Sequence, residues 1–188
     1  AAIITNKFRI HNAEQFYESF SEAAASTYYL FVGRPQAFST TTGGGTDISV
    51  PTPVDNIDDE YMYWRDALAA KKVASTDVSY VVPRINWTAG DTYAKYRHDY
   101  SSTNQAYGSK NTLWDASFYV MTSEYKVYKC MNNDGATAVT SGNEPSHVTN
   151  VEATTGDGYM WKYMYTMTTS QVQNFLSTDF MPVSTDST

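Results

Sequence analysis

The segment YMWKYMYTM, residues 159–167, alternates large aromatic side chains with methionine, lysine and threonine in a strict period of two. Successive side chains of a β-strand point to opposite faces of its sheet, so this period predicts a strand that buries a row of aromatic rings. Gly156-Asp157-Gly158, just before it, is typical of a turn. Two further apolar segments, residues 118–121 and 126–130, flank a short connection and predict a hairpin. The second half of the chain is therefore predicted to be rich in β-structure.

The remaining patterns predict further strands and helices along the chain. Strands are expected at residues 2–8, 27–32 and 78–82, and the second of these should be buried because TYYLFV is apolar on both faces. A first helix is expected at residues 13–24 with Asn12 as its N-cap, and a last short helix at residues 170–176.

A third helix is predicted between residues 55 and 72, because its acidic start and Lys71-Lys72 end suit the helix dipole. One apolar stripe runs along it, formed by Ile57, Tyr61, Trp64 and Leu68. The acidic cluster at its start would also suit a metal or catalytic group. A solvated helix terminus is the favoured interpretation, since no histidine or second carboxylate pair lies nearby in sequence.

These elements together predict an α+β fold that is strand-dominated and β-sandwich-like, with two or three short helices. We expect two parts, an N-terminal α+β part at residues 1–82 and a β-rich part at residues 83–188. Residues 39–53, which contain three consecutive glycines and two prolines, have the composition of an exposed loop.

Composition excludes several classes of protein. The chain has 188 residues, of which 15% are aromatic, so disorder over the whole length is excluded. Its 13 Lys and Arg against 20 Asp and Glu give a net charge of −7, and no basic stripe is present. We therefore expect no nucleic-acid partner and, because the longest apolar run is residues 28–32, no membrane insertion.

The sequence offers no pattern of catalytic or ligand-binding residues. The three histidines, His11, His98 and His147, are far apart and lack the spacing of metal sites. Cys130 is the single cysteine and is expected to be a buried strand residue without a redox role. No serine lies in a GxSxG motif. We therefore predict that the protein is not an enzyme and has no catalytic residues, metal ligands or cofactor.

One polar stretch, residues 93–107, is unusually rich in tyrosine and is the candidate interface. Its candidate residues are Tyr93, Tyr96, Arg97, Tyr100 and Tyr107. Tyrosine and arginine are enriched at protein interfaces, and the stretch looks too polar for a core. Two alternatives stay open: such tyrosines also stack on sugar rings, and they can simply cover a large loop.

Five segments, taken in order, are similar to the N-terminal part of a known family, the baseplate wedge protein of T-even-type contractile-tailed phages. These segments are IITNKFR (3–9), FVGR (31–34), VPRINW (82–87), VYKC (127–130) and GDGYMWKY (156–163). The resemblance spans about residues 3–167.

The resemblance implies a structural, non-enzymatic subunit of the virion tail baseplate, assembled in the host cytoplasm. It implies other wedge proteins and a second copy of the chain as partners, and no cofactor. Family members continue past the counterpart of Thr188, so the resemblance also implies a fragment of a longer subunit or a shortened relative. The alternative function is a carbohydrate-binding module that contacts the host cell surface.

Overall fold

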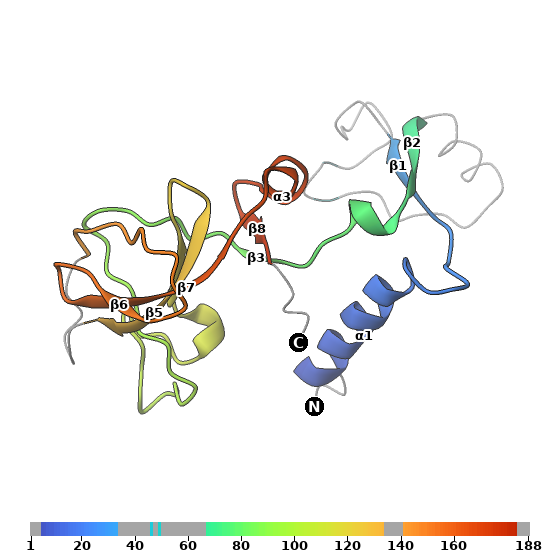
Figure 1. The fold of residues 1–188 in the computed structure, drawn as a ribbon. Coiled ribbons are helices and arrows are strands. Elements are labelled where there is room, and N and C mark those ends of the chain that lie inside the picture. Colours follow the sequence, from blue (N-terminus) through green and yellow to red (C-terminus); the bar gives the residue numbers. More distant parts are fainter. Residues whose placement is uncertain (1–4, 34–45, 47–48, 50–66, 134–140, 184–188) are drawn as a thin grey trace. The chain divides into compact units, whose positions relative to one another are not determined.

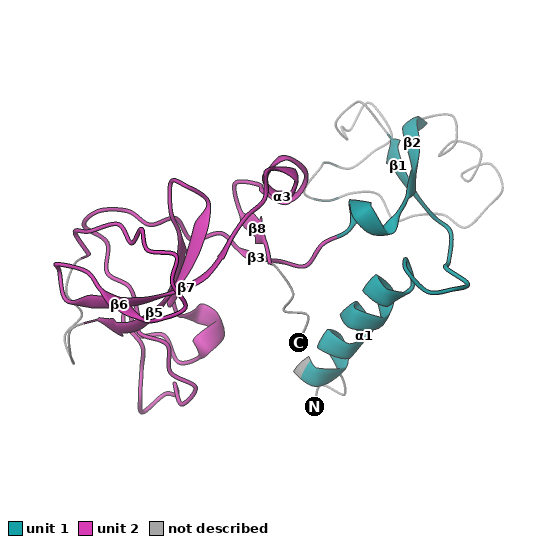
Figure 2. Cartoon of the chain, in the orientation of Figure 1, with its two compact units in different colours: residues 1–78 teal, residues 79–188 magenta. Residues whose placement is uncertain are grey.

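The computed structural model describes residues 5–33, 46, 49, 67–133 and 141–183 (Figure 1). The chain divides into two compact units, residues 1–78 and 79–188 (Figure 2). The described residues form two α-helices and eight strands, and all the strand pairs within the sheets are antiparallel. The prediction of a strand-dominated α+β fold with a few short helices is confirmed.

The first unit begins with a helix where the sequence analysis expected a strand. Helix α1 spans Asn6–Glu18, and the Thr5 hydroxyl accepts a hydrogen bond from the Phe8 N–H at 3.3 Å. This N-cap satisfies one of the free N–H groups of the first turn, which explains why residues 6–8 are helical rather than extended. The helix predicted at residues 13–24 is thus confirmed only up to Glu18, and Asn12 lies inside it.

The first unit also contains a two-stranded ribbon of β1 (Tyr28–Gly33) and β2 (Ala67–Val73). The strand predicted at residues 27–32 is confirmed, but the prediction that it is buried is wrong, because β1 is exposed along most of its length. The predicted end of the helix at residues 55–72 is also wrong, since residues 67–72 pair with β1. Pairing with a strand distant in sequence has overridden the local helical pattern.

Other predictions for the first unit fall on residues 34–45, 47–48 and 50–66, which lie outside the described part of the chain. They concern most of the loop at residues 39–53 and most of the helix at residues 55–72, including Ile57, Tyr61 and Trp64.

The second unit is built on a four-stranded antiparallel sheet in the order β4-β5-β7-β6. Its strands are β4 (Tyr119–Met121), β5 (Lys126–Asn133), β6 (Ala153–Thr154) and β7 (Tyr159–Thr166). The predicted hairpin is β4–β5, and the predicted aromatic strand is β7, so both are confirmed. Residues 85–87 run along the edge of β4 that does not pair with β5. There, the Met121 N–H donates to the Ile85 carbonyl oxygen, and the Trp87 N–H donates to the Met121 carbonyl oxygen.

A second ribbon and a short helix complete this unit. Strands β3 (Val81–Pro83) and β8 (Phe180–Pro182) pair with each other, so the strand expected at residues 78–82 is shorter than predicted. Helix α3 (Thr169–Phe175) confirms the last predicted helix. Thr168 and Gln171 form a capping box at its start, which explains why the helix begins there.

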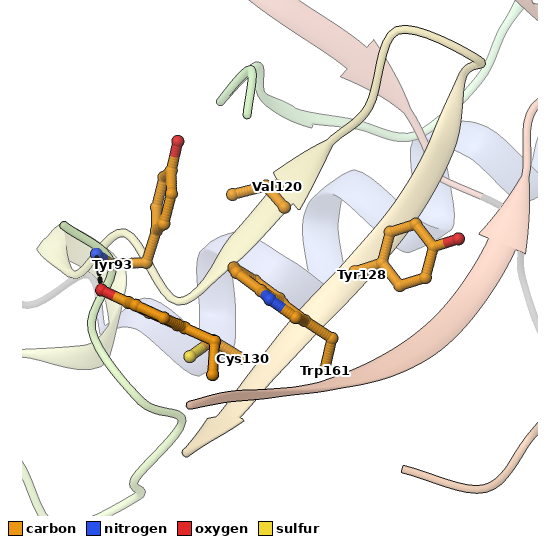
Figure 3. Close-up of a cluster of buried hydrophobic side chains, with 6 residues drawn as sticks. Tyr93, Val120, Tyr128, Cys130 and Trp161 are labelled. Atoms are coloured by element: carbon orange, nitrogen blue, oxygen red, sulfur yellow. Dashed lines mark hydrogen bonds between the residues drawn. The ribbon is translucent and has the colours of Figure 1, made fainter. Parts of the chain in front are cut away.

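The main core of the second unit packs aromatic rings from β7 against β4, β5 and the segment before them (Figure 3). The Tyr159 and Trp161 rings stack with centroids 5.5 Å apart, and the Tyr93 ring meets Trp161 edge-on at 5.6 Å. A second cluster joins Met121 of β4 to Met181 of β8. Among the described residues, every buried hydrophobic side chain belongs to the second unit.

Candidate assembly interface

The tyrosine-rich stretch runs from the core of the second unit to its surface. Tyr93 is only 2% exposed and packs against Tyr159 and Trp161. Its N–H donates to the Tyr159 hydroxyl at 3.2 Å, and its hydroxyl accepts from the Thr88 N–H at 2.7 Å. The expectation that this whole stretch is too polar for a core is therefore wrong at Tyr93, whose side chain does not reach the surface.

Tyr96 lies at the surface and is fixed from three sides. Its N–H donates to the Cys130 carbonyl oxygen at 2.7 Å, which ties the backbone to β5. Its ring lies 5.5 Å from that of Phe118, and the Lys129 Nζ lies over the ring at 4.4 Å from the centroid. A cation is attracted to the face of an aromatic ring, so Lys129 helps to hold the Tyr96 ring in place. The surface at Tyr96 therefore combines an ordered ring with the positive charge of Lys129.

Arg97 is oriented by a neighbouring carboxylate. Its Nε and Nη2 donate to Asp99 at 2.9 and 2.6 Å, and this pairing lowers the pKa of Asp99. Both side chains are exposed, so the ion pair contributes little to folding stability. Its effect is to hold the guanidinium in one geometry.

The last two candidate tyrosines differ in exposure. Tyr100 is half-buried, its hydroxyl donates to the Lys95 carbonyl oxygen, and burial raises its pKa. Tyr107 is 57% exposed. Both line a cavity of about 560 Å³ together with Arg97, so the structure brings three of the five candidate residues to one place.

The structure also exposes apolar side chains that the sequence analysis did not single out. Trp114, in the 3₁₀ turn Leu113–Asp115, is 81% exposed. A lone tryptophan in the polar segment before β4 was the available sequence signal. An apolar groove of about 200 Å³ lies between β3, β8 and the sheet, with Val82, Tyr119, Met164 and Met181 among its lining.

The three histidines are dispersed in the structure as they are in the sequence. His11 lies on exposed α1, His98 follows Arg97 at the surface, and the His147 ring lies 5.3 Å from Tyr128. Within the described ranges, no group of three His, Cys, Asp or Glu side chains could hold a metal ion. Neither described helix has the length and apolar character needed to cross a bilayer.

Comparison with known families decides the affiliation of the chain. The model of the family described as bacteriophage T4 Gp8 matches residues 2–142. The chain belongs to this family. The match covers the whole candidate stretch from Tyr93 to Tyr107. No curated protein matches the chain.

Membership of the Gp8 family confirms the resemblance to the baseplate wedge protein of T-even-type phages. The chain is a structural component of the virion tail baseplate, and it interacts with other baseplate proteins. The matched segment contains residues 2–78 of the first unit together with β3, β4 and β5, whereas β6, β7, α3 and β8 lie beyond it.

Proposed function

We propose that the chain is a wedge component that acts through protein–protein assembly, joining other wedge proteins and a second copy of itself. The observation that carries this proposal is its membership of the Gp8 family. The role is mechanical, and no catalytic step, cofactor or nucleic acid takes part in it.

The exposed apolar surface of the first unit supports this role. The exposed large side chains there are Phe8, Ile10, Phe16, Tyr29, Leu30, Phe31, Val32 and Leu68. A two-stranded ribbon is marginal in water by itself, and large apolar side chains exposed on both strands and on α1 favour contact with another protein. Cover from neighbouring chains would stabilise both the ribbon and α1.

In the second unit, we propose that Tyr96, Arg97 and Tyr107 form the contact. Tyr96 and Arg97 are already held by Lys129 and Asp99, so binding would cost little side-chain entropy. Tyrosine and arginine anchors of this kind typically lose about 2 kcal/mol or more of binding free energy on truncation.

The test is the double variant Tyr96→Ala/Arg97→Ala in a wedge-assembly experiment. We expect the isolated chain to keep its fold, because both side chains lie at the surface, and its association with wedge partners to weaken about 30-fold. The matched control is Tyr96→Phe/Arg97→Lys, which keeps the ring and the charge and should retain most of the association.

A carbohydrate-binding role is the second candidate, because Tyr100 and Tyr107 line the same cavity as the amides of Asn104 and Gln105. Sugars stack on aromatic rings and bond to amide side chains. If the double variant assembles normally but loses binding to host surface glycans, the carbohydrate function replaces the assembly function. If it loses neither, the stretch is only a surface loop.

A further inference from the structure

The cavity beside the candidate interface has walls that are held by hydrogen bonds within one loop. The Tyr100 hydroxyl donates to the Lys95 carbonyl oxygen, and the Asn104 Nδ2 donates to the Asp99 carbonyl oxygen at 3.2 Å. Ala106 exchanges backbone hydrogen bonds with Lys110 at 2.8 and 3.3 Å. A site of about 560 Å³ with such fixed walls has the volume of an ordinary ligand pocket.

The charges around this cavity are opposite in sign to the charge of the whole chain. Lys95 and Arg97 line it, and its described lining contains no carboxylate, although the chain carries a net charge of −7. Asp99 pairs with Arg97 through Nε and Nη2. No described group accepts a hydrogen bond from Lys95 Nζ or from Arg97 Nη1, so both can bind an incoming acceptor.

The remaining lining suits a carboxylate on a short aliphatic stem. Ala94 and Ala106 are almost fully buried and contribute apolar lining to the cavity, and the exposed Tyr107 lines it as well. An aspartate or glutamate side chain combines an apolar stem with a charged end. Arg97 already has Asp99 as a counter-charge, but a neutral sugar would supply none for Lys95.

We propose that this cavity binds an acidic side chain carried by a segment of a neighbouring baseplate protein. The proposal rests on the assembly function and names the chemistry of the partner. Lys95 and Arg97 bind the carboxylate, and the held geometry of Arg97 sets the direction from which it enters.

The test is an NMR titration of the full chain with N-acetyl-glutamate N-methylamide and with its glutamine counterpart. The Ala94 and Ala106 methyl signals report on the cavity. The glutamate probe should shift them in a saturable way, and the glutamine probe should bind about tenfold or more weakly, since it lacks the charge. Equal binding of the two probes, or saturable binding of N-acetylglucosamine in place of the glutamate probe, would overturn the proposal.

The variant for the same titration is Lys95→Met, with Lys110→Met as its matched control. Both remove one positive charge from the same loop, but Lys110 is not among the residues that line the cavity. The first should weaken binding of the glutamate probe about tenfold or more, and the second less than about twofold. Equal effects of the two variants would contradict the proposal.

Salt dependence keeps the proposal testable if the Lys95 variant does not fold. For the unaltered chain, affinity for the glutamate probe should fall as salt is raised, because the contact is partly exposed. An affinity for the glutamate probe that does not change with salt would contradict the proposed binding of a carboxylate. If no probe binds, yet Tyr96→Ala/Arg97→Ala blocks assembly, the assembly function stands and the acidic partner is excluded.

Discussion

Cys130 lies on β5 at the centre of the aromatic core and is fully buried. Burial in these surroundings raises the pKa of its thiol to about 12, because the charged thiolate would lose its hydration. The thiolate is the reactive form of cysteine, so the native protein holds Cys130 in an inert state.

We therefore predict that Cys130 does not react with an aromatic disulfide reagent in the native protein at pH 8. It should react with one equivalent once the chain is unfolded in guanidinium chloride. The measurement is the release of the coloured thiolate with and without denaturant. Rapid reaction of the native chain would show that the core around Trp161 is open.

Asp157 joins the turn before β7 to a segment that follows β5 in the chain. Its Oδ2 accepts hydrogen bonds from the Ser141 hydroxyl and the Gly142 and Asn143 N–H groups at 3.1, 2.8 and 3.0 Å. Its Oδ1 accepts from the Thr155 hydroxyl and from the Tyr159 N–H. Burial alone would raise the pKa of this carboxyl, but the hydrogen bonds outweigh it and lower the pKa to about 2.

This shift predicts a loss of stability in acid. A carboxyl whose pKa is lower in the folded than in the unfolded chain stabilises the fold above about pH 4, and that contribution is lost as the pH falls towards 2. Asp157→Asn should cost roughly 1–3 kcal/mol at pH 7, and the difference from the unaltered chain should shrink below pH 4.

The measurement is urea denaturation at a series of pH values. Asp91→Asn is the control, because Asp91 is also an acidic turn residue but is exposed, and it should change stability by less than about 0.5 kcal/mol. A constant difference between Asp157→Asn and the unaltered chain from pH 7 to pH 2 would contradict this role of the carboxylate.

At single positions, the sequence identified which residues were unusual but not which way they face. Tyr93 and Tyr96 belong to one tyrosine-rich stretch, yet the first lies in the core and the second at the surface. Tyr93 is held by Tyr159 and by Asn133, whose Nδ2 donates to the Tyr93 carbonyl oxygen at 3.2 Å. Partners so distant in sequence leave no local pattern.

Strand β7 supplies Tyr159 and Trp161 to the main core of the second unit. Trp161 is 0% exposed and contacts rings from β7 and from residue 93, whereas Trp114 is 81% exposed. The two residues form a matched pair for one substitution. Trp161→Ala should reduce the free energy of unfolding by about 3–5 kcal/mol, because it leaves a large cavity.

Trp114→Ala should change the stability of the isolated chain by less than about 0.5 kcal/mol. Both values come from urea unfolding followed by far-ultraviolet circular dichroism. Similar costs for the two variants would contradict the described packing of β7.

Elements were predictable where the local pattern and the packing agree. The period of two along β7 was visible in the sequence, and the last helix was expected at residues 170–176, so both elements form close to where they were predicted. The local pattern failed in the first unit, where Thr5 caps α1 in a region expected to be a strand. It failed again at β2, whose conformation is set by pairing with β1.

For the whole chain, the contrast in apolar exposure between the two units is consistent with membership of a baseplate family. The second unit has buried aromatic and methionine clusters, whereas the described part of the first unit exposes its large apolar side chains. A subunit of the baseplate has neighbours that can cover such surfaces. The expectation of an assembled protein came from resemblance and composition, but the exposure of β1 required the structure.

A cryo-EM map of the intact tail tests the central claim most directly. The assembly function predicts density for this chain within each wedge of the baseplate. Tyr96, Arg97 and the cavity lined by Lys95 should face another chain, and the apolar side chains of β1 should be covered. A baseplate without this chain, or one in which residues 93–107 and β1 both face solvent, would contradict the account.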